Sequence, residues 1–334
     1  MAKSYSSIIY FPFWEQTLHD IPKMLQKITK NILNSTQNLT LDDIDYIAVT
    51  MTAELSDVFK TKKEGVLTIL NALRNCFPKE KVKVVNNQGK FLDLDYAFKK
   101  YNTISAANWA STAIFLGNYV DCCVMIDAGS TTIDIIPIKN HNPISQGKDD
   151  ISRLIHHELV YTGGLRATIP SITHFFPFRD IMVRLSFEKF ALISDVHLIL
   201  GNISQEDYIN ETADNRPTDI EYCYARIARM ICLDLNSISL KELNIICNYI
   251  YQKQLELIKY EINKFMEELI ARDLDFPKKP LFVITGLSAN FLVKKVLKDL
   301  QYDNIQSFEQ LTNIPDNVSS SAFSVAGALY YTLS

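Results

Sequence analysis

The segment 127–132, Asp-Ala-Gly-Ser-Thr-Thr, has the residue types needed to bind an oxyanion and a metal ion. It lies between two apolar runs, 122–126 and 133–138, that read as strands. Gly129 would let the backbone approach a ligand closely or adopt a positive φ. Three hydroxyl side chains add hydrogen-bond donors: Ser130, Thr131 and Thr132. Asp127, at the end of a buried strand, needs a partner such as Mg²⁺ or water. The segment therefore predicts a hairpin tip that binds phosphate and a divalent cation; a plain polar turn is the alternative.

Polar side chains follow a second buried strand, predicted over "IDYIAVT" at 44–50. Strands alternate with helices in this part of the chain, as in "KEGVLTILNALRNCF" and "VKVV", which predicts an α/β layered domain. Ligands in such domains gather beyond the carboxyl ends of the strands. We therefore expect Thr52, Glu54 and Asp57 to lie near a site.

A second unit begins with the hairpin predicted around 127–132. It continues through "HHELVYTGGLRATIP" and a polar segment at 194–218. Within that segment Asp195 and His197 have the same-face spacing of a strand. A long helix is predicted from about Ser239 to Arg272, and Ser239 and Glu242 have the spacing of a capping box. "PLFVITGLSANFL" reads as a strand, a glycine turn and a helix start, and a small-residue helix closes the chain.

Composition excludes several classes of protein. The 334 residues suggest about two domains, and 47% hydrophobic with 22% charged residues is ordinary for a globular protein. A net charge of −4 without a basic run argues against nucleic acid as a partner. The sequence shows neither an apolar run of membrane-spanning length nor a leader-like start, which predicts a cytoplasmic protein without a membrane partner. The six cysteines form no C-x-x-C pair, so we expect core thiols.

Taken in order, several motifs resemble the hydantoinase/oxoprolinase family of the actin-like ATPase superfamily, in the branch linked to tetrahydromethanopterin and methanofuran. The motifs are "YFPFW", "MTAELSDVF", "AANWASTA", "IDAGSTTIDIIPI", "HELVYTGGLRATIP" and "ETADNRPT". The resemblance implies an α/β fold of two actin-like (RNase H-like) halves around a central cleft. We place the first half at 1–119 plus 316–334, and the second, with the phosphate loop and the long helix, at 120–315.

The resemblance also implies a first phosphate-binding hairpin ahead of the strand that matches "IIYFPFW". The sequence begins a few residues before that strand, so the first half is expected to lack the hairpin. Either the start is placed too late, or this homologue has lost half of its phosphate clamp. "ITGLSANFL" keeps Gly286 but has Leu287 and Ser288 where nucleotide-binding relatives are richer in glycine, which argues against an adenosine pocket.

The activity implied for this branch is the formation of an ether. The phenol of γ-glutamyltyramine would displace pyrophosphate from an aminomethylfuran methyl diphosphate, with Mg²⁺ held through Asp127. A phenol has a pKa of about 10, so a carboxylate could assist as general base, and Glu54 and Asp134 are the candidates. Further residues are expected to bind substrate: Thr52, Asp57, Asn108, Trp109, Glu158, Tyr161, Thr162 and Arg166.

Two other readings remain open from the sequence. One is an ATP-dependent kinase or amidohydrolase of the actin-like superfamily. The other is a non-catalytic, truncated homologue that acts as a binding protein. The partners are expected to be small molecules, and assembly into a homo-oligomer is left open.

Overall fold

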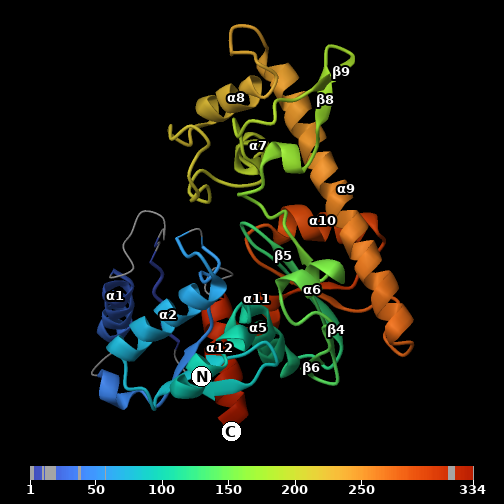
Figure 1. Cartoon of the computed structure of the whole chain (residues 1–334). Helices are drawn as coiled ribbons and strands as arrows, with labels where there is room; N and C mark the ends of the chain where they lie inside the picture. The colour runs from blue at the N-terminus through green and yellow to red at the C-terminus, as the bar shows by residue number, and fades with distance from the viewer. Residues whose placement is uncertain are drawn as a thin grey trace. The chain divides into compact units, whose positions relative to one another are not determined.

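The computed structural model describes residues 4–9, 11, 20–36, 39–56, 58–314 and 320–333. The chain divides into two compact units (Figure 1): unit 1 is 1–122, 138–153 and 309–334, and unit 2 is 123–137 and 154–308. The predicted boundaries differ in three places, because the predicted second half includes 120–122, 309–315 and the segment 138–153, which belong to unit 1. In the structure this segment packs on a helix of unit 1, where a Cβ on Gly117 would lie 2.0 Å from the carbonyl oxygen of His141.

Unit 1 combines a small sheet with surrounding helices. Its elements are α1 (Asp20–Ser35), η1 (Leu41–Asp43), β1 (Ile47–Val49), α2 (Lys62–Cys76), β2 (Val82–Val85), β3 (Phe91–Asp93), α3 (Leu94–Lys99), α4 (Tyr101–Ile104), α5 (Asn108–Gly117), β6 (Asn142–Pro143) and α12 (Ser320–Leu333). Helices α6 (Asp150–Ile155) and α11 (Phe308–Thr312) contain the chain positions at which one unit ends and the other begins. The strand order is β1-β2-β3, with β1 parallel to β2 and β3 antiparallel to it.

Apolar periodicity and capping explain the main elements of unit 1. The Thr61 hydroxyl caps α2 by accepting a hydrogen bond from the N–H of Glu64 (3.1 Å). The buried face of α2 then packs on the sheet through Val66, Leu70 and Leu73. Helix α12 packs against α5 at very short range, since a Cβ on Gly327 would lie 2.3 Å from the Phe115 ring. The expectation that the last helix returns to the first unit agrees with this packing.

Unit 2 is built on most of a six-stranded sheet. The order is β11-β10-β4-β5-β6, with β7 also paired to β5. Its elements are β4 (Cys123–Ala128), β5 (Ile133–Lys139), β7 (Leu159–Val160), η2 (Ile169–Ser171), β8 (Phe175–Phe178), β9 (Ile181–Arg184), α7 (Ile193–Ile199), α8 (Ile220–Arg229), α9 (Leu240–Arg272), β10 (Phe282–Thr285), η3 (Ala289–Val293), α10 (Lys294–Asp299) and β11 (Ile305–Ser307). Strand β6 and the last residues of β5 belong to unit 1 in the division of the chain.

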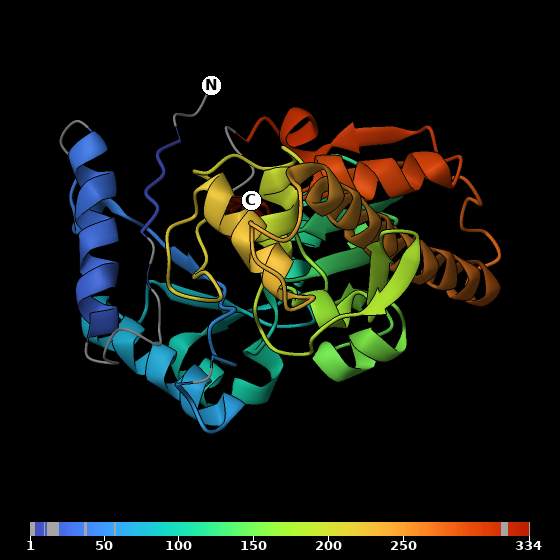
Figure 2. The same ribbon diagram turned by 90° about the horizontal axis from the view of Figure 1, so that it is seen from above.

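The long helix α9 is confirmed, with the predicted capping box. Ser239 Oγ accepts from the N–H of Glu242 (3.3 Å), and the Glu242 carboxylate accepts from the N–H of Ser239 (2.9 Å). The predicted apolar stripe is buried except at Leu257, which is half-buried. Helices α7, α8 and α10 and the β8–β9 hairpin pack along α9, and Figure 2 shows α10 lying alongside it.

Three sequence-based predictions fail in detail. The strand that matches "IIYFPFW", residues 8–14, is absent at residues 8, 9 and 11, and its other residues lie outside the described ones. Asp195 and His197 lie on the helix α7, because they begin a hydrogen-bonded turn after Leu192 rather than an extended strand. Cys232 is exposed, so not all cysteines are core thiols. Of the helices in the described ranges, none combines the length and apolar character needed to cross a membrane.

Candidate phosphate-binding site

The tip loop, residues 128–132, joins β4 to β5 at the carboxyl end of β4. Strand β4 is almost fully buried and pairs in parallel with β10, which places Asp127 beside Thr285. Strand β5 begins at the buried residue Ile133. The hairpin predicted from two apolar runs is therefore present, and two buried strands hold its tip.

The carbonyl groups of the tip loop all accept hydrogen bonds from within unit 2. The N–H of Gly163 donates to the carbonyl of Thr131 (2.9 Å), and that of Gly164 donates to the carbonyl of Gly129 (3.0 Å). The N–H groups of Leu165 and Arg166 both donate to the carbonyl of Ser130 (2.9 and 3.1 Å). The N–H of Gly129 donates to the carbonyl of Thr132 (3.0 Å), and that of Ser288 donates to the carbonyl of Ala128 (2.9 Å). Ser288 Oγ also lies 2.9 Å from the oxygen of Ala128 and 3.0 Å from that of Gly129. The acceptor side of the loop is therefore satisfied by the protein itself.

The donor side of the loop is different. Among the backbone hydrogen bonds of the described residues, none uses the N–H of Ser130, Thr131 or Thr132 as its donor. These three residues and Gly129 are half-buried rather than covered. Where the carbonyls of successive residues already accept hydrogen bonds, the N–H groups of those residues can form a concave site for an anion. The neighbouring hydroxyls add further donors. The geometry of this loop therefore suits a phosphate group.

Glycines outside the tip loop make this arrangement possible. A Cβ on Gly163 would lie 2.6 Å from the carbonyl carbon of Ser130 and 2.6 Å from the nitrogen of Thr131. Gly286, at φ 94°, would place a Cβ 2.4 Å from the oxygen of Ala128. Gly129 itself would meet only Thr132 O, at 3.8 Å, and its φ is not positive. Of the two alternatives expected for Gly129, the positive φ is therefore not adopted, and the close backbone approaches within the protein occur at Gly163 and Gly286.

Two carboxylates flank the tip loop. Asp127 Oδ1 lies 2.7 Å from where a Gly286 Cβ would stand, so the carboxylate borders the loop. Asp134 projects from β5, and its Oδ2 lies 3.5 Å from the hydroxyl of Thr132. Both side chains are half-buried.

The residues around the tip loop fit a Mg²⁺ shared with a substrate phosphate rather than a closed metal cage. Within the described ranges no group of three or more His, Cys, Asp or Glu side chains could hold a metal ion. Mg²⁺ commonly takes one or two protein carboxylates together with water and phosphate oxygens. Asp127 can supply one such carboxylate next to the anion-binding N–H groups.

The segment 161–166 runs along the tip loop and carries three predicted substrate-binding residues. Tyr161 and Arg166 are exposed, and the backbone N–H of Arg166 is anchored on Ser130. Thr162 is only 2% exposed, so it faces the interior. Glu158, which precedes this segment, is fully buried, and its Oε1 lies 3.5 Å from a guanidinium nitrogen of Arg272. Its role in substrate binding stays a prediction.

Interior polar residues that the sequence reading missed also support this segment. Gln254, on α9, donates to Thr162 Oγ1 (3.0 Å) and to the carbonyl of Gly163 (3.0 Å). Gln254 Oε1 accepts from His197 Nε2 (2.9 Å). Burial lowers the pKa of His197 to about 3, so the ring is neutral. The available signal was a polar residue, Gln254, inside the apolar stripe of α9.

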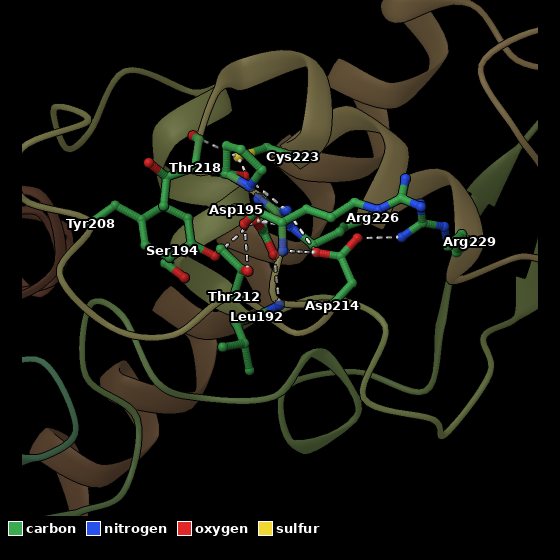
Figure 3. Close-up of polar contacts among 12 residues, drawn as sticks. Leu192, Ser194, Asp195, Tyr208, Thr212, Asp214, Thr218, Cys223, Arg226 and Arg229 are labelled. Carbon is green, nitrogen blue, oxygen red and sulfur yellow. Dashed lines mark hydrogen bonds and ion pairs between the residues drawn. The ribbon is translucent and has the colours of Figure 1, made fainter. Parts of the chain in front are cut away.

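A second buried polar cluster, drawn in Figure 3, fixes the "ETADNRPT" motif. Arg226 is fully buried and donates from Nε to Asp195 (2.8 Å) and from Nη1 to Asp214 (3.1 Å) and to the carbonyl of Pro217 (3.2 Å). The Asp195 carboxylate also accepts from Tyr208 Oη (2.9 Å). Burial alone would lower the pKa of Arg226, but the attraction of Asp195 outweighs it and raises the pKa. The motif's polar residues therefore stabilise their own loop, and Asp195 pairs with Arg226 while His197 bonds to Gln254.

Unit 1 holds the remaining predicted residues. Glu54 is 2% exposed, and its Oε1 accepts from Ser105 Oγ (2.9 Å) and from the N–H of Ala106 (2.7 Å). Its Oε2 is buried and has no hydrogen-bond partner among the described residues. Since a buried polar atom without a partner is unusual, Glu54 is marked as a functional candidate.

The other predicted residues of unit 1 differ in their exposure. Asn108 begins α5, and Trp109 is buried with the Arg153 guanidinium stacked 4.6 Å from its ring centroid. Thr52 is exposed, and Asp57 lies outside the described residues. Trp109 therefore has a packing role, and substrate contact by these four residues stays a prediction.

Comparison with known proteins identifies the family. The hydantoinase/oxoprolinase family matches residues 45–330. A protein of Methanocaldococcus jannaschii is 36% identical over 323 residues, which cover 96% of this chain and 89% of that protein. A protein of Methanococcus vannielii is 36% identical over 183 residues, 54% of this chain and 78% of that protein. Both are named (4-{4-[2-(gamma-L-glutamylamino)ethyl]phenoxymethyl}furan-2-yl)methanamine synthase.

A solved structure supports the fold. The nucleotide-free structure of acetone carboxylase aligns with a TM-score of 0.50 at 13% identity, covering 93% of this chain. This chain spans 45% of that chain's length. The mixed α/β architecture thus has a solved counterpart. This chain belongs to the hydantoinase/oxoprolinase family.

Proposed function

We propose that this chain is a transferase that forms the furan–phenol ether of methanofuran biosynthesis. The name shared by its two relatives describes the product, in which a furan methylene is joined to a phenol oxygen. The identity extends over nearly the whole chain in one of them. The proposed substrates are γ-glutamyltyramine and an aminomethylfuran methyl diphosphate.

The observation that carries the proposal is the orientation of the tip loop. Its carbonyls accept hydrogen bonds from unit 2, while the backbone N–H groups of Ser130, Thr131 and Thr132 donate no backbone hydrogen bond among the described residues. A departing diphosphate develops negative charge, and preorganised N–H donors stabilise such charge without reorganisation. A Mg²⁺ ion bound through Asp127 would neutralise further charge on the diphosphate.

The reaction needs one bond to form and one to break. The phenol oxygen attacks the furan methylene, and the bond from that carbon to the diphosphate oxygen breaks with its electron pair on pyrophosphate. Because the aminomethylfuran ring can spread positive charge, the C–O bond can weaken ahead of attack. Positioning of the two substrates then matters more than a strong nucleophile. The phenolic proton must pass to a base.

Two carboxylates are proposed for that proton. Asp134 lies next to the tip loop, 3.5 Å from the Thr132 hydroxyl. Glu54 has one oxygen engaged by Ser105 and Ala106 and the other without a partner among the described residues. The second oxygen, Oε2, can accept a proton from a substrate hydroxyl, while the bonds to Oε1 fix the orientation of the carboxylate.

Glu54→Gln is expected to lower the turnover number by about 10²- to 10⁴-fold, the usual contribution of a general base. The amide keeps the oxygen that accepts from Ser105 and Ala106, so the fold should persist. Glu64→Gln is the matched control, because that exposed carboxylate only accepts from the N–H of Lys60 (2.9 Å). Steady-state rates of the two variants, with their melting temperatures, decide the matter. A turnover number unchanged in Glu54→Gln would leave Asp134 as the base.

The remaining assignments belong to the same proposal. Exposed Tyr161 and Arg166 would contact the substrate beside the tip loop, and Arg166 could pair with a carboxylate or a phosphate. Two actin-like halves, a cytoplasmic location and Mg²⁺ as the only cofactor complete the proposal.

Phosphorus NMR tests the proposed activity directly. The purified protein with Mg²⁺ is offered the furan diphosphate and γ-glutamyltyramine in one tube and ATP in another. We expect pyrophosphate only when furan and phenol are both present, and no ADP. ADP in the second tube together with silence in the first would overturn the transferase in favour of an ATP-dependent enzyme.

A further inference from the structure

A chain of three polar side chains crosses the interior of unit 2 and ends at the segment that supports the tip loop. We call Asn202, His197 and Gln254 the Gln254 network. Asn202 Nδ2 lies 3.0 Å from His197 Nδ1, and His197 Nε2 lies 2.9 Å from Gln254 Oε1. Gln254 Nε2 lies 3.0 Å from both Thr162 Oγ1 and the carbonyl oxygen of Gly163. His197 and Gln254 are fully buried.

The direction of every hydrogen bond in this network follows from its last member. A backbone carbonyl can only accept, so the amide nitrogen of Gln254 must face Gly163. Its oxygen then faces His197, which must donate through Nε2–H. Nδ1 of the ring is left as an acceptor, and the Asn202 amide donates to it. One tautomer of neutral His197 satisfies all the bonds.

The surroundings keep the ring in that state. The rings of Tyr251 and Phe291 lie against His197, with centroids 5.6 Å and 4.7 Å away. Protonation at Nδ1 would place two donors face to face beside Asn202 and would bury a charge among aromatic rings. The donor–acceptor direction of the hydrogen bonds from Asn202 through His197 and Gln254 to Gly163 therefore stays the same across the physiological pH range.

The position of Gly163 decides how the tip loop is oriented. Its N–H donates to the carbonyl of Thr131 (2.9 Å), and the next N–H, of Gly164, donates to the carbonyl of Gly129 (3.0 Å). The peptide unit whose carbonyl is held by Gln254 thus donates to the tip loop through its own N–H, that of Gly164. Without the hydrogen bond from Gln254, the segment 161–166 could rotate and release the carbonyls of Gly129 and Thr131, to which it donates.

We propose that Gln254 and His197 are positioning residues of the anion site: they fix the Gly163 peptide so that the tip loop presents its N–H groups to the diphosphate. This inference rests on the proposed function and assigns the interior residues that preorganise its site. Neither residue touches the ligand, so both act through Thr162 and Gly163.

Gln254→Met tests the inference by keeping the shape of the side chain and removing both donors. Calorimetric titration of the whole protein with pyrophosphate in excess Mg²⁺ measures the dissociation constant. We expect it to rise at least tenfold, and hydrogen exchange of peptides covering 129–132 and 161–166 to become faster. Gln252→Met is the matched control, because Gln252 is an exposed glutamine on the same helix, and it should leave both readouts unchanged.

A second pair of variants keeps the test decisive if Gln254→Met does not fold. His197→Leu removes the donor to Gln254, whereas His197→Gln offers an amide N–H in its place. We expect weaker pyrophosphate binding in the leucine variant and recovery in the glutamine variant. Equal affinity in wild type and His197→Leu, and in Gln254→Met where that variant folds, would overturn the inference. Absence of pyrophosphate binding in the wild type would instead refute the proposed anion site itself.

Discussion

Replacing Gly163 with alanine is expected to lower turnover about 100-fold, the scale of loss that follows from misplacing a reacting group by about 1 Å. The new Cβ would lie 2.6 Å from the carbonyl carbon of Ser130, 2.6 Å from the nitrogen of Thr131 and 2.7 Å from the oxygen of Gly129. All three are backbone atoms, which cannot move aside as a flexible side chain could. The tip loop must shift, and its row of N–H groups shifts with it. Steady-state kinetics of the variant give the change in turnover.

Gly201→Ala separates this effect from a general loss of stability. Gly201 has a φ of 69°, and no atom lies within 4 Å of the point that a Cβ would occupy. Alanine there costs about 1–2 kcal/mol of stability through backbone strain alone. We expect Gly201→Ala to melt at a lower temperature but to keep its turnover number. Normal turnover in Gly163→Ala would show that the tip loop does not need its observed position.

Arg226→Met is expected to lower the free energy of unfolding by about 3–5 kcal/mol, the usual cost of removing one partner from a buried ion pair. Arg226 and Asp195 are both fully buried, and methionine would leave the Asp195 carboxylate with Tyr208 and one backbone N–H as its donors. Asp214 and Pro217 would lose their links to Arg226 on α8 as well. Urea unfolding at neutral pH measures the loss.

Arg229→Met is the comparison for this variant on the same helix. Its guanidinium pairs with Asp214 (2.7 Å), but the two side chains are 34% and 20% exposed. A partly solvated pair contributes about 0–1 kcal/mol. Similar losses in the two variants would show that burial of the Arg226 pair does not set its contribution.

Features with a local cause were predictable from the sequence. The capping box at Ser239 and the apolar stripe that follows define α9 within one residue. Two apolar runs around a polar turn define the hairpin of β4 and β5. In each case residues close in sequence determine the hydrogen bonds and the buried face, so no distant contact is needed.

Long-range contacts explain what the sequence did not reveal. Gln254 and Gly163 are 91 positions apart, and Ser288 and Ala128 are 160 apart. Two-residue spacing suggested a strand for Asp195 and His197, but a turn of helix places them toward different partners, Arg226 and Gln254. The close packing at Gly163 becomes visible only once the segment 161–166 lies on the tip loop.

The most direct test of the diphosphate site is an NMR titration of protein labelled with ¹⁵N at serine and threonine, using pyrophosphate in excess Mg²⁺. Binding at the tip loop should move the amide proton signals of Ser130, Thr131 and Thr132 downfield, because each N–H gains a charged acceptor. Ser171 and Thr332, whose hydroxyls donate to carbonyls elsewhere in the chain, should not move. Saturable binding that leaves the three tip-loop amides unchanged would contradict the assignment of this hairpin as the diphosphate site.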